Sequence, residues 1–151
     1  MLNVREKILT DDSVTRLQYH KYKPFGQPAF ASNDSISIVI QNENTYLLPF
    51  ESRLYIEGQL LNAEGQGKAS DIELTKNCAL YLFSDIQYCL NDQIIDDVRN
   101  PGNATLMKGY VSFTPSEANA LQNSGWTTRD DLKKLIDDDG RFNFCIPLKM
   151  M

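Results

Sequence analysis

Apolar and polar residues alternate along much of the chain, and this pattern predicts a protein built mainly from β-strands. Successive side chains of a strand point to opposite faces of a sheet, so alternation places one face on a core and the other in water. The pattern predicts strands over residues 14–22, 35–40 and 53–60, with a further short strand near Ile72 and Leu74. Gly58 lies inside the third strand, where we expect a bulge or a close approach by another group.

A β-hairpin is predicted between residues 78 and 98. Residues 86–90 alternate between apolar and polar, the dipeptide Asn91-Asp92 follows, and the apolar pattern resumes at residues 94–95. Asn and Asp tolerate the positive φ angles that a two-residue hairpin turn requires. The Asn-Pro-Gly-Asn sequence at residues 100–103 then predicts the end of the second strand and a turn.

Two short helices are predicted in the second half of the chain. The first begins at Thr-Pro-Ser-Glu, residues 114–117, because Thr suits the N-cap, Pro the first helical position and Glu the return hydrogen bond. It continues through Leu121 and ends near Ser124-Gly125. The second covers residues 130–136, where Leu132, Leu135 and Ile136 share one face.

The last predicted strand is strongly apolar, with alternation over residues 142–148 after a turn at residues 137–140. A strand of this kind normally pairs on both sides or is covered by other elements. Since the sequence ends at Met151, we expect either an amino-terminal portion of a longer protein or a strand that pairs with another chain.

Many short strands, with helices confined to connections, favour an antiparallel sandwich over a parallel α/β sheet. The length of 151 residues predicts one domain.

The charge balance argues against nucleic acid as a partner. Fifteen Lys and Arg residues against twenty Asp and Glu give a formal charge of −5 at pH 7, the wrong sign for contacts with a phosphate backbone. The one basic candidate comprises Arg16, Lys21 and Lys23, interleaved with Tyr19 and Tyr22. We interpret it as the polar positions of a half-exposed strand.

The sequence predicts an intracellular protein that contacts no membrane. No apolar run approaches the roughly 20 residues that cross a bilayer, and the segment from Arg5 onward is too charged for a secretory signal. Cys78, Cys89 and Cys145 are odd in number and widely spaced. This spacing fits buried thiols in a reducing compartment better than a disulfide framework.

The residues that catalysis needs are scarce. His20 is the single histidine, whereas metal sites need several converging ligands and a Ser or Cys nucleophile would need that same histidine as its base. The acidic run at residues 137–140 lacks the ligand spacing and terminal Glu of a calcium loop, so we interpret it as a solvated turn. We therefore assign no catalytic, cofactor-binding or metal-binding residue and expect no enzyme.

Trp126, the only tryptophan, has two interpretations. It can serve as a platform on which a sugar ring stacks, or as a hydrophobic anchor that packs the end of a helix on the sheet. We favour the anchor.

Six short segments, in order along the chain, resemble one family of proteins. They are residues 17–24 (Leu-Gln-Tyr-His-Lys-Tyr-Lys-Pro), 46–52 (Tyr-Leu-Leu-Pro-Phe-Glu-Ser), 54–58 (Leu-Tyr-Ile-Glu-Gly), 110–115 (Tyr-Val-Ser-Phe-Thr-Pro), 123–126 (Asn-Ser-Gly-Trp) and 146–149 (Ile-Pro-Leu-Lys). With these segments the chain resembles the amino-terminal part of double jelly-roll proteins. That family is encoded in many animal genomes and is related to the major capsid proteins of Polinton-type DNA viruses.

The resemblance implies an antiparallel jelly-roll sandwich with one or two short helices in its connections. It also implies a structural role in an intracellular setting or a virion, self-association into trimeric capsomers, no cofactor and no catalysis. A single jelly roll needs most of 150 residues, so residues 1–151 are expected to hold the first of two jelly rolls, incomplete at its carboxyl-terminal end. The alternative function is a ligand-binding or carbohydrate-binding β-sandwich, for which Trp126 and the tyrosines are the candidates.

Overall fold

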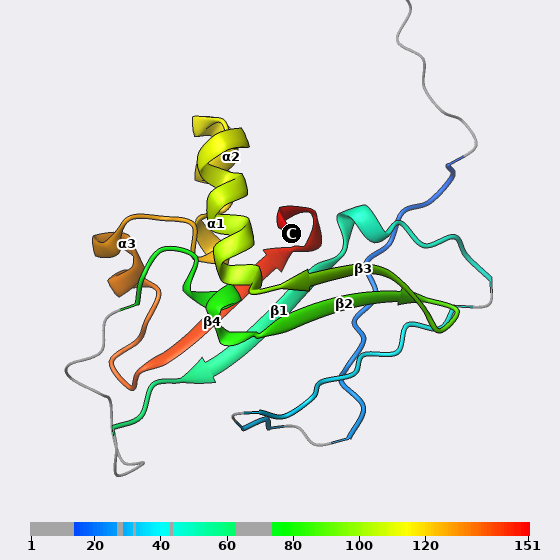
Figure 1. The fold of residues 1–151 in the computed structure, drawn as a ribbon, viewed down its shortest axis with the longest axis horizontal. Helices are drawn as coiled ribbons and strands as arrows, with labels where there is room; N and C mark the ends of the chain where they lie inside the picture. Colours follow the sequence, from blue (N-terminus) through cyan, green and yellow to red (C-terminus); the bar gives the residue numbers. More distant parts are fainter. Residues whose placement is uncertain (1–13, 27–28, 32, 43, 63–73) are drawn as a thin grey trace, which may run out of the picture. The chain divides into compact units, whose positions relative to one another are not determined.

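A computed structural model describes residues 14–26, 29–31, 33–42, 44–62 and 74–151, and it divides the chain into two units, Met1–Leu47 and Leu48–Met151. All helices and strands of the described residues belong to the second unit (Figure 1). Its main elements are β1 (Arg53–Gln59), β2 (Asp85–Leu90), β3 (Gln93–Arg99), α1 (Pro101–Ser112), α2 (Pro115–Ala120), α3 (Arg129–Lys134) and β4 (Arg141–Pro147). Four short 3-10 helices accompany them, namely η1 (Pro49–Glu51), η2 (Cys78–Leu82), η3 (Gln122–Ser124) and η4 (Leu148–Met150).

The first unit contains no strand among its described residues. The strands predicted over residues 14–22 and 35–40 are therefore wrong. Among its described residues, the Phe25 N–H group donates a hydrogen bond to the Ser37 carbonyl oxygen at 2.8 Å. Alternation makes a strand only where a neighbouring strand receives the backbone groups, and the described residues of this unit supply none.

β1 and β4 form a two-stranded antiparallel sheet, which confirms the strands predicted at residues 53–60 and 142–148. Their register runs from Arg53 opposite Pro147 to Gln59 opposite Arg141. Gly58 lies opposite Phe142, and a Cβ atom at this position would stand 2.3 Å from the Phe142 Cζ atom. The expected close approach at Gly58 is therefore confirmed, and the absence of a side chain admits the Phe142 ring.

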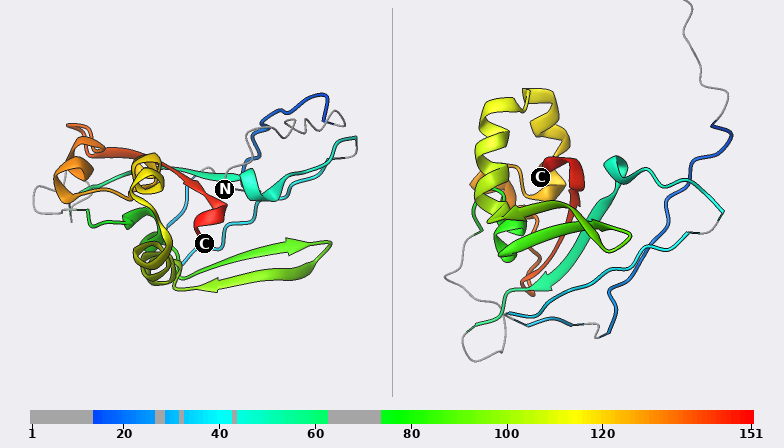
Figure 2. Two further views of the ribbon diagram at one scale, coloured as in Figure 1. Left: turned by 90° about the horizontal axis from the view of Figure 1, so that it is seen from above. Right: turned by 45° about the vertical axis from the view of Figure 1, so that its right-hand side comes forward.

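β2 and β3 form the predicted hairpin. Asn91 and Asp92, with φ angles of 49° and 62°, occupy the two positions of its turn, as a type I′ turn requires. The left view of Figure 2 shows the hairpin extending away from α1 as a two-stranded ribbon. The apolar run that precedes it, Cys78–Leu82, forms η2 and supplies buried residues to the core.

Both predicted helices of the second half are confirmed. The Thr114 hydroxyl accepts a hydrogen bond from the Glu117 N–H group, and the Glu117 carboxylate accepts one from the Thr114 N–H group, so the capping box of α2 is complete. Thr128 caps α3 by accepting from the Asp131 N–H group. No helix among the described residues is long and apolar enough to cross a bilayer.

α1 was not predicted, and the expectation of one or two short helices is wrong because three α-helices lie within residues 74–151. The predicted turn at residues 100–103 is the start of this twelve-residue helix, with Pro101 in its first turn. Its buried positions are Pro101, Gly102, Thr105 and Gly109. These small side chains make no apolar stripe, which is the signal that indicates a helix in a sequence.

Asn77 joins η2 to two other segments. Its Nδ2 group donates to the Gly102 carbonyl oxygen at 2.9 Å and to the Thr105 hydroxyl at 2.8 Å. Its backbone N–H group donates to the Gly125 carbonyl oxygen at 2.8 Å. Asn77 is fully buried and has a φ angle of 64°, a conformation that Asn adopts more readily than other residues with a side chain.

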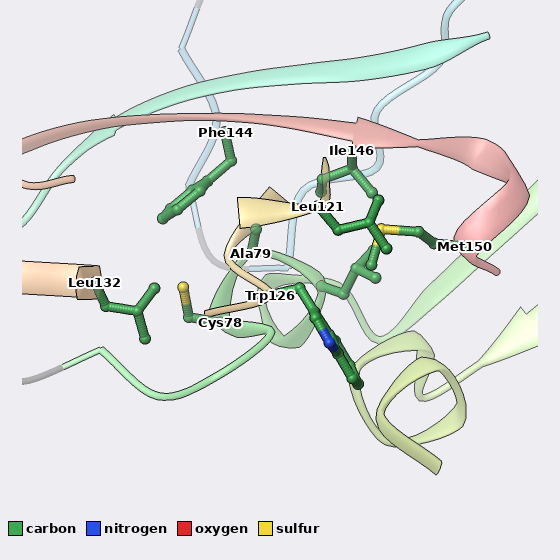
Figure 3. Packing of buried hydrophobic residues seen from close by; sticks show 9 residues of the cluster. Cys78, Ala79, Leu121, Trp126, Leu132, Phe144, Ile146 and Met150 are labelled. Carbon is green, nitrogen blue, oxygen red and sulfur yellow. The ribbon is translucent and has the colours of Figure 1, made fainter. Parts of the chain in front are cut away.

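The core lies against one face of β4 (Figure 3). Its buried apolar residues come from η2, β4, η4, α3 and the segment between α2 and α3: Cys78, Ala79, Leu80, Leu121, Trp126, Leu132, Phe144, Ile146 and Met150. Trp126 is 4% exposed, and its ring contacts those of Tyr110 and Phe113 at centroid distances of 5.7 Å and 5.1 Å. This burial confirms the anchor and excludes the sugar platform.

The described residues thus contain two antiparallel sheets of two strands each. The expectation of a mainly β, antiparallel protein is confirmed at that level. A jelly roll has about eight strands, and the part of the chain that the structure describes contains four.

Substitution of Gly109 tests the packing of α1 on Trp126. A Cβ atom at residue 109 would stand 2.3 Å from the Trp126 Cη2 atom, so we expect Gly109→Ala to lower the free energy of unfolding. Alanine is more favourable than glycine in a helix by about 1 kcal/mol, whereas overpacking costs about 1–3 kcal/mol. Because the added Cβ would also stand 2.6 Å from the Trp126 Cζ2 atom, we expect the upper part of that cost and a net loss of about 1–2 kcal/mol. The measurement is urea unfolding followed by tryptophan fluorescence.

The matched control is Met107→Ala on the exposed side of α1, where the side chain is 72% exposed. We expect this variant to stay within about 0.5 kcal/mol of the original protein. A Gly109→Ala protein more stable than the original would contradict the proposed packing.

Candidate interaction surface

The residues that the sequence singles out for chemistry are not gathered into one site. His20 is exposed in the first unit, as are Arg16, Lys21 and Lys23. Across the ranges that the structure describes, no three His, Cys, Asp or Glu side chains are placed to hold a metal ion.

The acidic run at residues 137–140 forms the turn between α3 and β4. Its three Asp side chains are exposed, and the Gly140 N–H group donates to the Asp137 carbonyl oxygen at 3.0 Å. Gly140 has a φ angle of 79°, which glycine adopts at no steric cost. The interpretation as a solvated turn is confirmed.

The three cysteines are free, and they differ in their surroundings. Cys78 is buried in the core, where desolvation raises the pKa of its thiol to about 11. Cys145 is half-buried on β4, and Cys89 is exposed on β2. The expectation that all three thiols are buried is wrong at Cys89, which lies near the hairpin turn at an exposed position of β2.

Backbone geometry distinguishes the two edges of the β1–β4 sheet. In an antiparallel pair, alternate residues direct their N–H and C=O groups to the partner and the residues between them direct theirs outward. The Leu60 N–H group donates to the Gly140 carbonyl oxygen at 2.8 Å, and the Leu148 N–H group donates to the Ser52 carbonyl oxygen at 2.9 Å. Both bonds continue the register of the ladder, so the even-numbered residues of β1 bond to β4. The outward-facing residues of β1 are Arg53, Tyr55, Glu57 and Gln59.

The outer edge of β4 is closed by three groups. Asp137 and Arg141 exchange two hydrogen bonds, from the Asp137 N–H to the Arg141 carbonyl oxygen at 3.0 Å and from the Arg141 N–H to the Asp137 carboxylate at 2.6 Å. The Ser124 hydroxyl donates to the Cys145 carbonyl oxygen at 2.7 Å. Pro147 has no N–H group to offer. A further strand is therefore blocked from pairing with this edge.

The outer edge of β1 is open among the described residues, since no backbone group pairs with its outward positions. Its outward side chains are also exposed, with Tyr55 at 58%. The Tyr55 hydroxyl donates to the Glu57 carboxylate at 2.7 Å, and this bond raises the pKa of the tyrosine. β1 thus presents an unpaired edge bordered by a polar face.

Apolar side chains are exposed on the hairpin and on α1. The hairpin exposes Leu90 (56%), Ile94 (59%) and Ile95 (61%), and α1 exposes Met107 (72%), Tyr110 (69%) and Val111 (90%). Single exposed apolar residues are common, whereas groups of them mark surfaces of association. Ile94 pairs with Cys89 and Leu90 pairs with Gln93, so Leu90 and Ile94 lie on opposite faces of the hairpin beside its turn. We define Leu90, Ile94 and Ile95, which surround this end of the hairpin, as the hairpin surface.

Reasoning from the sequence missed the difference between the two edges. It expected the carboxyl-terminal strand, now β4, to need further pairing, whereas the open edge belongs to β1. Pro147 inside that strand and Asp137 four residues before it were available as signals of a closed edge. The contribution of Ser124 depends on tertiary contact with β4 and has no local signature.

Comparison with known protein families gives a match over the second half of the chain. Residues 72–151 match the protein family described as the double jelly roll-like domain. This match includes β2, β3, β4 and all three α-helices, and it covers more than half of the chain. No curated protein and no solved structure matches the sequence.

The different surroundings of the cysteines predict different reactivities. The thiolate is the reactive form, so at pH 8 we expect Cys89 to react with a thiol reagent in the folded protein at least tenfold faster than Cys78. The measurement is mass spectrometry of peptides after timed labelling.

In urea, where both thiols are exposed, we expect the two rates to converge. Labelling of Cys78 as fast as Cys89 in the folded protein would contradict the burial of Cys78.

Proposed function

The chain belongs to the double jelly roll-like domain family, and from this premise we propose that it is a structural, capsid-type module that associates with copies of itself and catalyses no reaction. A domain of this family indicates a structural role of the capsid type. The finer parts of the proposal are a viral origin related to Polinton-type capsid proteins and assembly into trimers. They are supported by the six sequence segments that resemble that family.

The observation that carries the proposal is the hairpin surface. Leu90, Ile94 and Ile95 are each more than half exposed, and they lie on a ribbon that extends from α1 (Figure 2). Burial of apolar area is worth about 25 cal/mol per Å², so contact with another copy would recover free energy that the single chain leaves unused. In a structural protein that associates with its own copies, these exposed apolar side chains can form the contact between copies.

Residues 1–151 correspond in this proposal to the first of two jelly rolls. The structure of Leu48–Met151 supports an antiparallel β protein with helices between its strands.

A ligand-binding β-sandwich is the competing function, and the structure weakens it at its main candidate. Trp126 is 4% exposed, and Lys76 Nζ lies 4.7 Å from the centre of its ring. A sugar ring therefore finds no free indole face at this position. No observation favours this function over self-association.

Sedimentation and electron microscopy of the purified chain test the proposal. We expect concentration-dependent oligomers, and we expect Ile94→Asp/Ile95→Asp to weaken association by about tenfold or more, because charged side chains cannot be buried unpaired at an apolar contact. The measurement is sedimentation velocity over a range of protein concentrations, with negative-stain images of the largest species.

The matched control is Gln93→Asp, which adds negative charge to the same hairpin at an exposed polar residue. It is expected to associate like the original protein. A chain that stays monomeric at every concentration would refute self-association.

A further inference from the structure

We infer that the open edge of β1 pairs antiparallel with the same edge of a second copy, so that two sheets join into one of four strands across a twofold axis. This inference deepens the proposed function and rests on it, because it names one surface through which copies associate. The hairpin surface lies on a different sheet, so the two contacts are separate.

The first argument is that, within the β1–β4 sheet, only β1 can accept a strand. The outward groups of β4 are taken up by Asp137 and Ser124, and Pro147 lacks a donor. The outward N–H and C=O groups of Arg53, Tyr55 and Glu57 find no partner among the described residues. An edge of this kind is a template for pairing with another chain.

The second argument is that the sequence of β1 is complementary to itself. Only odd-numbered residues direct backbone groups outward, so hydrogen-bonded pairs across the new interface join odd residues to odd residues. With Tyr55 opposite Tyr55 of the second copy, Arg53 lies opposite Glu57 of that copy, and the reverse pair forms by symmetry. Two pairs of opposite charge result.

Neighbouring registers are worse. Centring the pairing on Ile56 places Arg53 opposite Gln59, which pairs no opposite charges. Centring it on Leu54 places Glu57 opposite Glu51, and centring it on Arg53 places two arginines together. Like charges directly opposite destabilise a sheet, and opposite charges stabilise it, so the register centred on Tyr55 is preferred.

The other face of β1 supports the same register. Leu54 and Ile56 are half-buried and pack against the core. In the register centred on Tyr55, Leu54 lies opposite Ile56 of the second copy. The apolar underside of one sheet therefore continues into that of the other, while the charged pairs remain on the exposed face.

Among the described residues the β1–β4 sheet has one open edge, and this limits assembly through that sheet. An interface that uses the same patch on both copies closes after two, whereas two open edges would allow a growing fibre. The closed edge of β4 prevents such growth through this sheet. A twofold contact at β1 is compatible with a threefold contact elsewhere, because the two use different surfaces.

A charge exchange tests the inference. The variants are Arg53→Glu, Glu57→Arg and the double variant that carries both, compared by sedimentation equilibrium at low ionic strength. Each single reversal places like charges opposite each other twice, and we expect it to weaken the pairing at β1 by about tenfold or more. The double variant restores both opposite-charge pairs and should return to within about threefold of the original protein.

Arg99→Glu is the matched control, because Arg99 is an exposed arginine on β3 in the other sheet. It makes the same change of charge and is expected to leave the pairing unchanged.

Cross-linking tests the register. In a Cys89→Ser/Cys145→Ser background, which removes the thiol opposite residue 55 in the same sheet, Tyr55→Cys is expected to give a covalent dimer with a short bifunctional thiol reagent. Gln59→Cys should not, since residues 59 of the two copies would be eight positions apart along the strand, roughly 26 Å. The Cys89→Ser/Cys145→Ser protein without an added cysteine is the blank.

The outcomes separate this inference from the proposed function. Two results would overturn the pairing at β1 without contradicting self-association. One is association that the single charge reversals do not weaken, and the other is a double variant that associates no better than the single variants. A chain that never associates would overturn both. A monomer whose Arg53, Tyr55 and Glu57 amides are protected from hydrogen exchange would place a strand of the same chain on this edge and overturn the inference.

Discussion

Each residue of a strand carries an N–H and a C=O group, and a sheet of two strands pairs only the half that faces inward. The remaining half must find other partners or stay in water. At β4 the chain supplies those partners from the turn before the strand and from Ser124 of η3. At β1 it supplies none among the described residues. The two strands have equal length, but only β4 has its outward backbone groups occupied. This difference decides which edge of the sheet can bind another strand.

The closed edge also explains why the core gathers at β4 rather than at β1. Because Ser124 bonds to the strand, the segment that carries Trp126 is held beside Phe144 and Ile146. Asn77 then connects the same segment to α1 and η2 through its side chain and its backbone. Hydrogen bonds position the packing elements, and apolar burial stabilises the arrangement once it is formed.

The parts of this fold that the sequence predicts are those with local causes. The turn residues Asn91-Asp92 and the capping box at Thr114 act within a few positions, so the hairpin and α2 were predictable. α1 was not, because it buries glycine and threonine instead of an apolar stripe. The alternation at residues 35–40 predicted a strand that the structure does not contain. A strand needs a neighbouring strand, and no local pattern can supply one. The candidate surface was found only in part for the same reason, because an open edge is defined by pairings between distant segments.

The register of β1 with β4 has a consequence for the order of folding. Its partners are more than eighty residues apart along the chain, whereas the strands of the hairpin are joined by two residues. Contacts between distant segments form slowly, because the intervening chain must first lose its freedom. During synthesis β1 therefore leaves the ribosome long before β4, and Leu54 and Ile56 stay uncovered in the interval. Chaperone binding to the nascent chain is expected to centre on this segment rather than on the hairpin.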